Sequence, residues 1–188
     1  MIIKNNFYVI TGGPGSGKTS LLQELQFRGV RCVPEVAREI IREQVFKGSN
    51  VVPWKDAKAY SMVMLQHSVR DFISLMNTEE LHFFDRGIPD AYGYAQLMNV
   101  DQEEMLLRSV NNYRYNRTVF ILTPWADIYV NDQERKQDFK IAVETYLILR
   151  ATYTRLSYKI VEVPCLPVFQ RADFVLNSID QQHGISKR

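Results

Sequence analysis

Residues 12–19 read GGPGSGKT, a complete P-loop of the pattern G-x-x-x-x-G-K-[ST]. An apolar run at 7–10 precedes the motif, and a stretch compatible with a helix follows it at 20–25. Glycine-rich turns of this kind point successive backbone N–H groups into one concavity, where they bind phosphate oxygens. The competing interpretation is a plain glycine-rich turn between strand and helix, but both flanks match the motif. The chain is therefore expected to bind a nucleoside triphosphate.

The P-loop chemistry assigns a role to each residue type. Lys18 is expected to contact the β- and γ-phosphates, and the Thr19 hydroxyl is expected to ligate Mg²⁺. The first turn of the following helix adds free N–H donors and the positive end of its dipole. The predicted nucleotide-binding residues are Gly12, Gly13, Pro14, Gly15, Ser16, Gly17, Lys18, Thr19 and Ser20.

Two charged residues, Asp85 and Arg86, follow the apolar segment 81–84. An apolar strand that ends in aspartate suits the Walker B role, in which the carboxylate holds Mg²⁺ directly or through water. The alternative for Asp85 is a cap on the following turn. Arg86 is expected either to form a bidentate contact with a phosphate or acceptor anion, or to form a structural ion pair with Glu35.

A second carboxylate, Glu35, follows the apolar segment 30–33 and Pro34. Because Pro34 favours an extended predecessor, Glu35 is expected to emerge at the edge of the sheet. A carboxylate there can accept the proton of an attacking hydroxyl in phosphoryl transfer, although it can also cap the helix that it precedes. Arg38 lies one turn further along the same face and is a candidate ligand for a substrate carboxylate or phosphate.

The segment 125–137 is polar and dense in charge, and it lies between an apolar strand and a helix. In a phosphotransferase, a lid at this position would bring Arg135 and Lys136 onto the γ-phosphate and exclude water. The alternative is the solvated first turn of the next helix. The apolar loop 164–167 is a candidate for packing against the nucleotide base, with Arg171 nearby, and an ordinary strand–helix turn fits it equally well.

Short apolar strands and helical patterns alternate along the chain, which is typical of parallel βαβ units. Strands are expected at 7–10, 30–33, 81–85, 118–123 and 159–163. Helices are expected at 20–27, 35–46, 53–76, 89–112 (as two short helices around Asn99), 138–153 and 168–179. Gly29 suits the left-handed end of the first helix.

These elements predict an α/β fold class, a three-layer α/β/α P-loop NTPase with a five-stranded parallel sheet. Right-handed crossovers place the carboxyl ends of all strands at one edge, where ligands of open α/β sheets bind. The chain is expected to be a single domain over 1–188, with a helical cover at about 46–80 and the lid at about 125–137.

The composition is that of an ordinary water-soluble protein. The 188 residues are 46% apolar and 23% charged, with a net charge of +2 and no basic run that would indicate a nucleic-acid partner. The longest uncharged stretch, 5–17, is too short to span a membrane, and no signal-peptide pattern is found. Cys32 and Cys165 are expected to be buried reduced thiols. A cytoplasmic location is expected.

The chain resembles the NadR-like AAA-type predicted ATPases, which are related to P-loop nucleoside kinases. The matching pieces are 10–19, 33–40, 84–90, 128–135 and 161–164 followed by Arg171-Ala172. They occur in the order of the family and extend over nearly the whole chain. The resemblance implies a nucleoside-kinase-like fold with strand order 2-3-1-4-5.

The sequence is also similar to deoxynucleoside kinases around Pro34-Glu35 and Asp85-Arg86. In those kinases the glutamate after the second strand acts as the base, and the acid–arginine pair after the third strand serves the phosphates and the metal. The sequence departs from them at Gly87, where they commonly have a hydroxyl residue, and in the segment 125–137, which carries one clear arginine instead of several.

The function expected is that of a Mg²⁺-dependent, ATP-binding small-molecule phosphotransferase, similar to a nucleoside or ribosylnicotinamide kinase, with an unidentified acceptor. The catalytic residues expected are Lys18, Glu35, Asp85, Arg86 and Arg135. Acceptor contacts are expected from Glu35, Arg38 and Arg86, and Mg²⁺ ligands from Thr19 and Asp85. The alternative is a nucleotide-dependent switch, a regulatory ATPase or GTPase with slow hydrolysis and a protein or lipid partner. No N-K-x-D guanine motif is present, which favours ATP over GTP.

Overall fold

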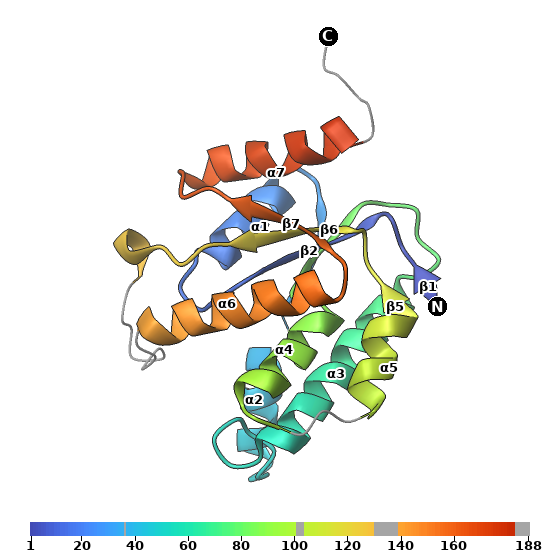
Figure 1. Cartoon of the computed structure of the whole chain (residues 1–188), viewed down its shortest axis with the longest axis vertical. Coiled ribbons are helices and arrows are strands. Elements are labelled where there is room, and N and C mark those ends of the chain that lie inside the picture. The colour runs from blue at the N-terminus through green and yellow to red at the C-terminus, as the bar shows by residue number, and fades with distance from the viewer. Residues whose placement is uncertain (36, 101–103, 130–138, 183–188) are drawn as a thin grey trace.

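The centre of the molecule is a parallel five-stranded sheet with the order β3-β4-β2-β6-β7 (Figure 1). The computed structural model describes residues 1–35, 37–100, 104–129 and 139–182. The strands are β2 (Phe7–Gly12), β3 (Arg31–Val33), β4 (His82–Asp85), β6 (Thr118–Leu122) and β7 (Lys159–Val163). This is the predicted order, because β2 is the first of the five strands along the chain and occupies the middle of the sheet.

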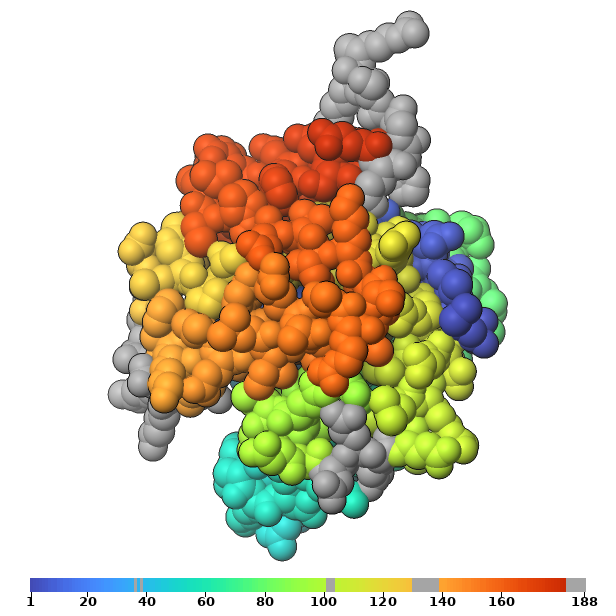
Figure 2. Space-filling view, viewed as in Figure 1, coloured from blue at the N-terminus to red at the C-terminus, as the bar shows by residue number. Residues whose placement is uncertain are grey.

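Helices cover both faces of this sheet (Figure 1). One face carries α1 (Lys18–Phe27) and α7 (Val168–Gln182), which pack on each other. The opposite side carries α3 (Ala57–Ser74), α4 (Ile88–Leu97), α5 (Glu104–Asn112) and α6 (Phe139–Arg155), with α2 (Ala37–Phe46) beside α3. The three-layer α/β/α arrangement expected from the sequence is confirmed. In the space-filling view, α6 and α7 form much of the face turned to the reader (Figure 2).

The alternation of side chains along β2 explains why helices are needed on both faces. Phe7 and Val9 belong to the core between the sheet and the helices α3 to α6. Tyr8 and Ile10 belong to the second core, between the sheet and the pair α1 and α7. All four are fully buried. A strand that is apolar on both faces is stable only between two layers.

A second, two-stranded parallel sheet joins β1 (Ile2–Ile3) to β5 (Tyr113–Arg114). The sequence did not predict this pair. Two residues are too few for a periodic signal, and the partners lie more than a hundred positions apart in the chain. The pair holds the N-terminus next to the end of α5 (Figure 1).

Several helix boundaries differ from the predicted ones. The helix expected from residue 53 begins at Ala57, because the side chain of Asp56 accepts a hydrogen bond from the Ala59 N–H and caps the first turn. The helix expected from residue 35 begins at Ala37. Gly29 has a φ of 84° directly after the end of α1, as predicted.

The prediction that both cysteines are buried was wrong for Cys165. Cys165 is an exposed free thiol, and its Sγ lies 3.3 Å from the Thr123 hydroxyl. Cys32 is a half-buried free thiol, and burial raises its pKa to about 11. Among the described helices, none has both the length and the apolar character that crossing a membrane requires.

Candidate active site

The P-loop forms the turn between β2 and α1. Gly15 and Gly17 have φ angles of 73° and 79°, the left-handed region that favours glycine. Gly17 is the N-cap of α1, so the first N–H groups of the helix point toward the loop. The buried Ser16 hydroxyl donates to the Gly13 carbonyl at 2.9 Å and holds the turn closed. This backbone can bind an anion in the manner that the motif predicts.

Lys18, the first residue of α1, is directed at two carboxylates. Its Nζ lies 2.9 Å from Asp85 Oδ1 and 3.7 Å from Glu35 Oε2, and the side chain is 8% exposed. Burial raises the pKa of the Asp85 carboxyl, and the charge of Lys18 offsets part of that effect. The sequence predicted all three residues for the site, and the structure brings them together.

Arg86 also contacts Glu35, from the turn after β4. Its Nε donates to Glu35 Oε1 at 2.6 Å, and its Nη1 lies 3.3 Å from Asp90 Oδ1. Burial acts against the guanidinium charge, but Glu35, Asp90 and Asp85 outweigh it and raise the pKa of Arg86 above its usual value. Of the two roles expected for Arg86, the ion pair with Glu35 is present.

The sheet register explains why these side chains meet. In the parallel ladders Val33 pairs with Phe84, and Ile10 pairs with Asp85, so the three strands end side by side. Residues that follow each strand therefore lie at one edge, together with the P-loop that follows β2. Glu35 and Arg86, which are in contact at this edge, are 51 residues apart along the chain.

A small recess with an inner volume of about 20 Å³ and an open mouth adjoins this cluster. Its inner wall is formed by Val33 and Phe84 of the sheet. Its outer wall is formed by Met64, Ser68 and Asp71, which lie on one face of α3 at the spacing of successive helical turns. Glu35, Asp85 and Arg86 also line the recess. A small molecule bound at its mouth would lie against the charged cluster.

Other residues contact the P-loop on the side of β2 that carries β6 and β7. Arg171 of α7 is 5% exposed, and its Nη1 lies 3.4 Å from the carbonyl oxygens of Ser16 and Gly17. Its guanidinium lies 5.7 Å from the ring centroid of Trp125. Burial lowers the pKa of Arg171. The structure therefore places Arg171 against the P-loop backbone with Trp125 beside it, and the binding of a nucleotide base there stays a prediction.

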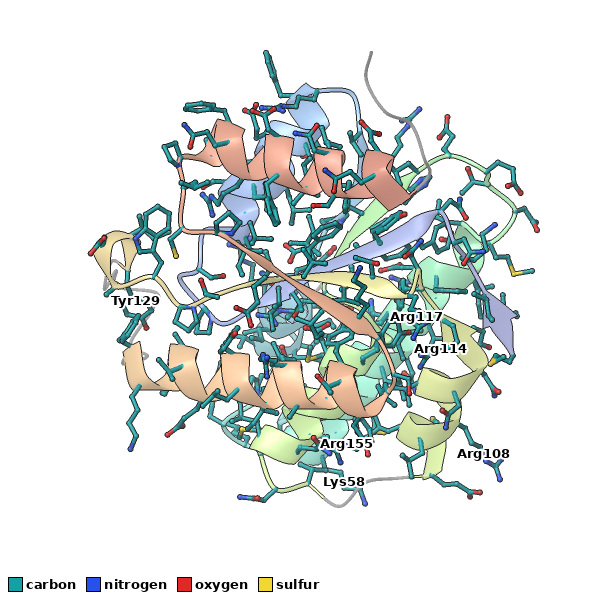
Figure 3. The ribbon with its side chains drawn as sticks, turned by 45° about the horizontal axis from the view of Figure 1, so that its top comes forward. Lys58, Arg108, Arg114, Arg117, Tyr129 and Arg155 are labelled. Carbon is teal, nitrogen blue, oxygen red and sulfur yellow. The ribbon has the colours of Figure 1, made fainter. Side chains whose placement is uncertain are left out.

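Tyr129 lies over the P-loop and beside the start of α6 (Figure 3). Its ring is 5.3 Å from that of Phe139, centroid to centroid, in an edge-to-face arrangement. A Cβ added to Gly15 would come within 2.5 Å of the Tyr129 ring, so only glycine fits this approach. Tyr129 is the last described residue before the segment 130–138.

Some predicted site residues are not placed. Arg135 and Lys136 lie outside the described residues, as does the side chain of Arg38, whose backbone belongs to α2. Thr19 and Ser20, in contrast, are described, and both are exposed on the first turn of α1.

The donors near the P-loop suit Mg²⁺. The Thr19 hydroxyl and the Asp85 carboxylate are oxygen ligands, which Mg²⁺ prefers. Within the described part of the chain, no group of three or more histidine, cysteine or acidic side chains could hold a metal by itself. A cation that is held by one or two protein oxygens together with substrate phosphates fits this donor set.

The profile of a family described as AAA domain matches residues 7–171. The chain belongs to this family. The match begins with β2 and ends at Arg171, so it includes the P-loop, the charged cluster and Trp125. No curated protein matches the chain.

The fold is shared with several solved structures, among them two kinases. Deoxyadenosine kinase from M. mycoides, solved with dCMP and dCDP, has a TM-score of 0.64 at 19% identity, over 93% of this chain and 99% of that one. NadR in complex with NR has a TM-score of 0.71 at 16% identity, over 97% of this chain and 52% of that one. Shikimate kinase from Acinetobacter baumannii with shikimate has a TM-score of 0.53 at 13% identity, over 94% and 93%.

Sequence reasoning did not single out Asp90, which contacts Arg86 in the structure. The local sequence signal at Asp90 is that it lies three positions after Gly87, at the start of a helix that has Pro89 in its first turn. That pattern predicts a helix cap and gives no indication of the contact with Arg86.

Proposed function

We propose that the chain is a Mg²⁺-dependent phosphotransferase that transfers the γ-phosphoryl group of ATP to a hydroxyl group of a small acceptor. The observation that carries the proposal is the meeting of Lys18, Asp85, Glu35 and Arg86 beside the recess under α3. A P-loop that only binds or hydrolyses nucleotide does not need a recess next to its Walker B carboxylate. An acceptor site does.

Each residue of the cluster has a role in this proposal. The P-loop backbone binds the triphosphate, and Lys18 leaves Asp85 to contact the β- and γ-phosphates. Thr19 and Asp85 would hold Mg²⁺, which neutralises charge on the phosphates as the phosphoryl group moves. Arg86 would stabilise negative charge on the transferred group from the acceptor side.

Glu35 is proposed as the general base. It lines the recess, so a hydroxyl of a bound acceptor can approach its carboxylate. Taking the hydroxyl proton leaves the acceptor oxygen free to attack the γ-phosphorus in line with the departing ADP. The proton ends on Glu35 and the phosphoryl group on the acceptor.

The nucleotide base is proposed to bind near Trp125 and Arg171, on the side of β2 away from the recess. Trp125 offers a flat face and a single N–H donor, and this N–H points to the Asp127 carboxylate at 3.1 Å. The absence of an N-K-x-D guanine motif from the sequence supports ATP as the donor.

A panel of acceptors tests the proposal. Purified protein is incubated with Mg²⁺ and either ATP or GTP, together with nucleosides, nicotinamide riboside or sugars, and ADP or GDP release is measured. The expected result is release above the acceptor-free rate for at least one acceptor, with formation of its phosphate ester confirmed by mass spectrometry. Release that no acceptor increases, combined with hydrogen exchange at α3 and 125–129 that changes with nucleotide, would instead support the switch.

A further inference from the structure

Asp90, the third residue of α4, is 2% exposed and has no role in the proposed phosphoryl transfer. Four donors converge on its two carboxylate oxygens. Oδ1 accepts from the Thr11 hydroxyl and from Arg86 Nη1, and Oδ2 accepts from the Gly87 N–H at 2.8 Å and from the Tyr153 hydroxyl. These partners come from β2, from the turn after β4 and from α6. Asp90 is therefore a fixed carboxylate at the junction of three elements.

Arg86 is a residue that needs such an anchor. Its φ of 72° is in the left-handed region, which a residue with a side chain adopts only when its surroundings determine it. Its N–H donates to the Ile10 carbonyl at 3.0 Å, which fixes the backbone. The guanidinium then spans two carboxylates, with Nε on Glu35 and Nη1 on Asp90.

Glu35 and Asp90 differ in the contacts that they make besides the one to Arg86. Glu35 is 23% exposed and lines the recess, so a hydroxyl of a bound acceptor can replace one of its contacts. Asp90 is buried and is held by three donors besides Arg86. When Glu35 turns to a substrate, Asp90 still holds the guanidinium.

We propose that Asp90 is a positioning residue for Arg86. Its carboxylate keeps the guanidinium at the edge of the recess, and Arg86 in turn keeps Glu35 beside Lys18. The reaction that Arg86 serves rests on the proposed function, whereas the placement of Arg86 by Asp90 does not. The rival interpretation is that Asp90 only caps α4, since it accepts the Gly87 N–H.

Three variants separate the two interpretations. Asp90→Asn keeps the size of the side chain, but its amide N–H groups would face two of the converging donors, and the pairing with Arg86 loses its charge. Tyr153→Phe is the matched control, because it removes one donor from the same carboxylate without touching Arg86. Glu35→Gln weakens the other contact of Arg86 and leaves Asp90 intact, so it tests whether Asp90 alone holds the guanidinium. Folding is verified for each variant by thermal unfolding and by nucleotide binding.

The first measurement needs no activity. Hydrogen exchange of the Arg86 Nη1–H groups, which donate to Asp90, is followed by NMR of ¹⁵N-labelled protein, with the signal assigned from its absence in Arg86→Met. We expect exchange to be about 10-fold faster or more in Asp90→Asn, the factor for the loss of one charged hydrogen bond, and unchanged in Tyr153→Phe. Unchanged exchange in a folded Asp90→Asn would overturn the proposal.

If Asp90→Asn does not fold, Glu35→Gln decides. In this variant Arg86 is held by Asp90, and the proposal requires that its guanidinium signals remain distinct and slowly exchanging. Exchange at the rate of a solvent-exposed arginine would overturn the proposal, because Asp90 would then not suffice to hold the side chain.

The second measurement is a double-mutant cycle on acceptor-dependent turnover. We expect Asp90→Asn to lower kcat by about 10- to 100-fold while the nucleotide Kd stays near that of the parent. Asp90→Asn combined with Arg86→Met should be no slower than Arg86→Met alone, because both act through one guanidinium. Effects that multiply would overturn the positioning role. A parent protein without acceptor-dependent turnover would count against the proposed function, and the NMR measurement would still decide the role of Asp90.

Discussion

Replacing Glu35 by glutamine tests the proposed chemistry most directly, because the substitution keeps the shape of the side chain and removes its charge. Glu35 Oε1 is 2.6 Å from Arg86 Nε, and Oε2 is 3.7 Å from Lys18 Nζ. Glutamine can keep a hydrogen bond to Arg86, but it cannot take a proton from an attacking hydroxyl. We expect the acceptor-dependent kcat to fall by about 10²- to 10⁴-fold, the usual contribution of a general base, while the nucleotide Kd changes little.

The same substitution should lower stability, because Lys18 and Arg86 lose a shared carboxylate. Removing one partner of a fully buried ion pair costs about 3–5 kcal/mol, and an exposed pair contributes about 0–1 kcal/mol. Because the Glu35 side chain is 23% exposed, we expect the free energy of unfolding to fall by an intermediate amount, about 1–2 kcal/mol. A bound triphosphate brings negative charge to Lys18, so the loss should shrink when nucleotide is added.

Turnover is measured by coupled detection of ADP, and stability by denaturant unfolding with and without nucleotide. Glu162→Gln is the control, because Glu162 also pairs with an arginine, Arg150, but on an exposed surface. This control should lose less than about 1 kcal/mol and keep its turnover. Full acceptor-dependent turnover in Glu35→Gln would refute the role as base. A stability loss that grows on adding nucleotide would refute the electrostatic argument.

Three further predictions concern other parts of the site. Lys18→Ala should weaken nucleotide binding by about 10- to 100-fold, the value of a charged hydrogen bond to phosphate, and an unchanged Kd by calorimetry would contradict the P-loop assignment. In Trp54→Phe, Trp125 is the remaining tryptophan, and its fluorescence should change on nucleotide binding; an unaltered spectrum at saturation would place the base elsewhere. The exposed Cys165 should react with a thiol reagent at pH 8 much faster than Cys32, whose pKa of about 11 leaves on the order of 0.1% thiolate. The reactivity of Cys32 should rise as the pH approaches 11, and equal rates at pH 8 would contradict its burial.

Most of the sheet could be predicted because its strands are short apolar runs that end at clear breaks. The segment 159–163 matched the observed strand at both ends, and 118–123 differed by one residue. The β1–β5 pair could not be predicted, since it depends on a contact between residues 2 and 113. The start of α3 was misplaced because Pro53 suggested a helix start, whereas Asp56 caps the helix in the structure.

The residues of the site could be predicted where each one follows a strand. Glu35, Asp85 and Arg86 were identified in this way, and the strand order explains why they meet. Asp90 was not identified, and among the donors to its carboxylate is Tyr153, which lies 63 residues away in the chain. No local pattern encodes such a partnership, because it arises only when α6 packs on α4.

The strand order also divides the site between two halves of the sheet. β3 and β4 lie on one side of β2 and carry the recess, while β6 and β7 lie on the other and carry Trp125 and the helix of Arg171. Under the proposed function, acceptor choice and nucleotide choice are therefore encoded in separate parts of the protein that share only the central strand and its loop. Substitutions on α3 could then alter the acceptor during evolution, or in the laboratory, while the nucleotide half is inherited unchanged.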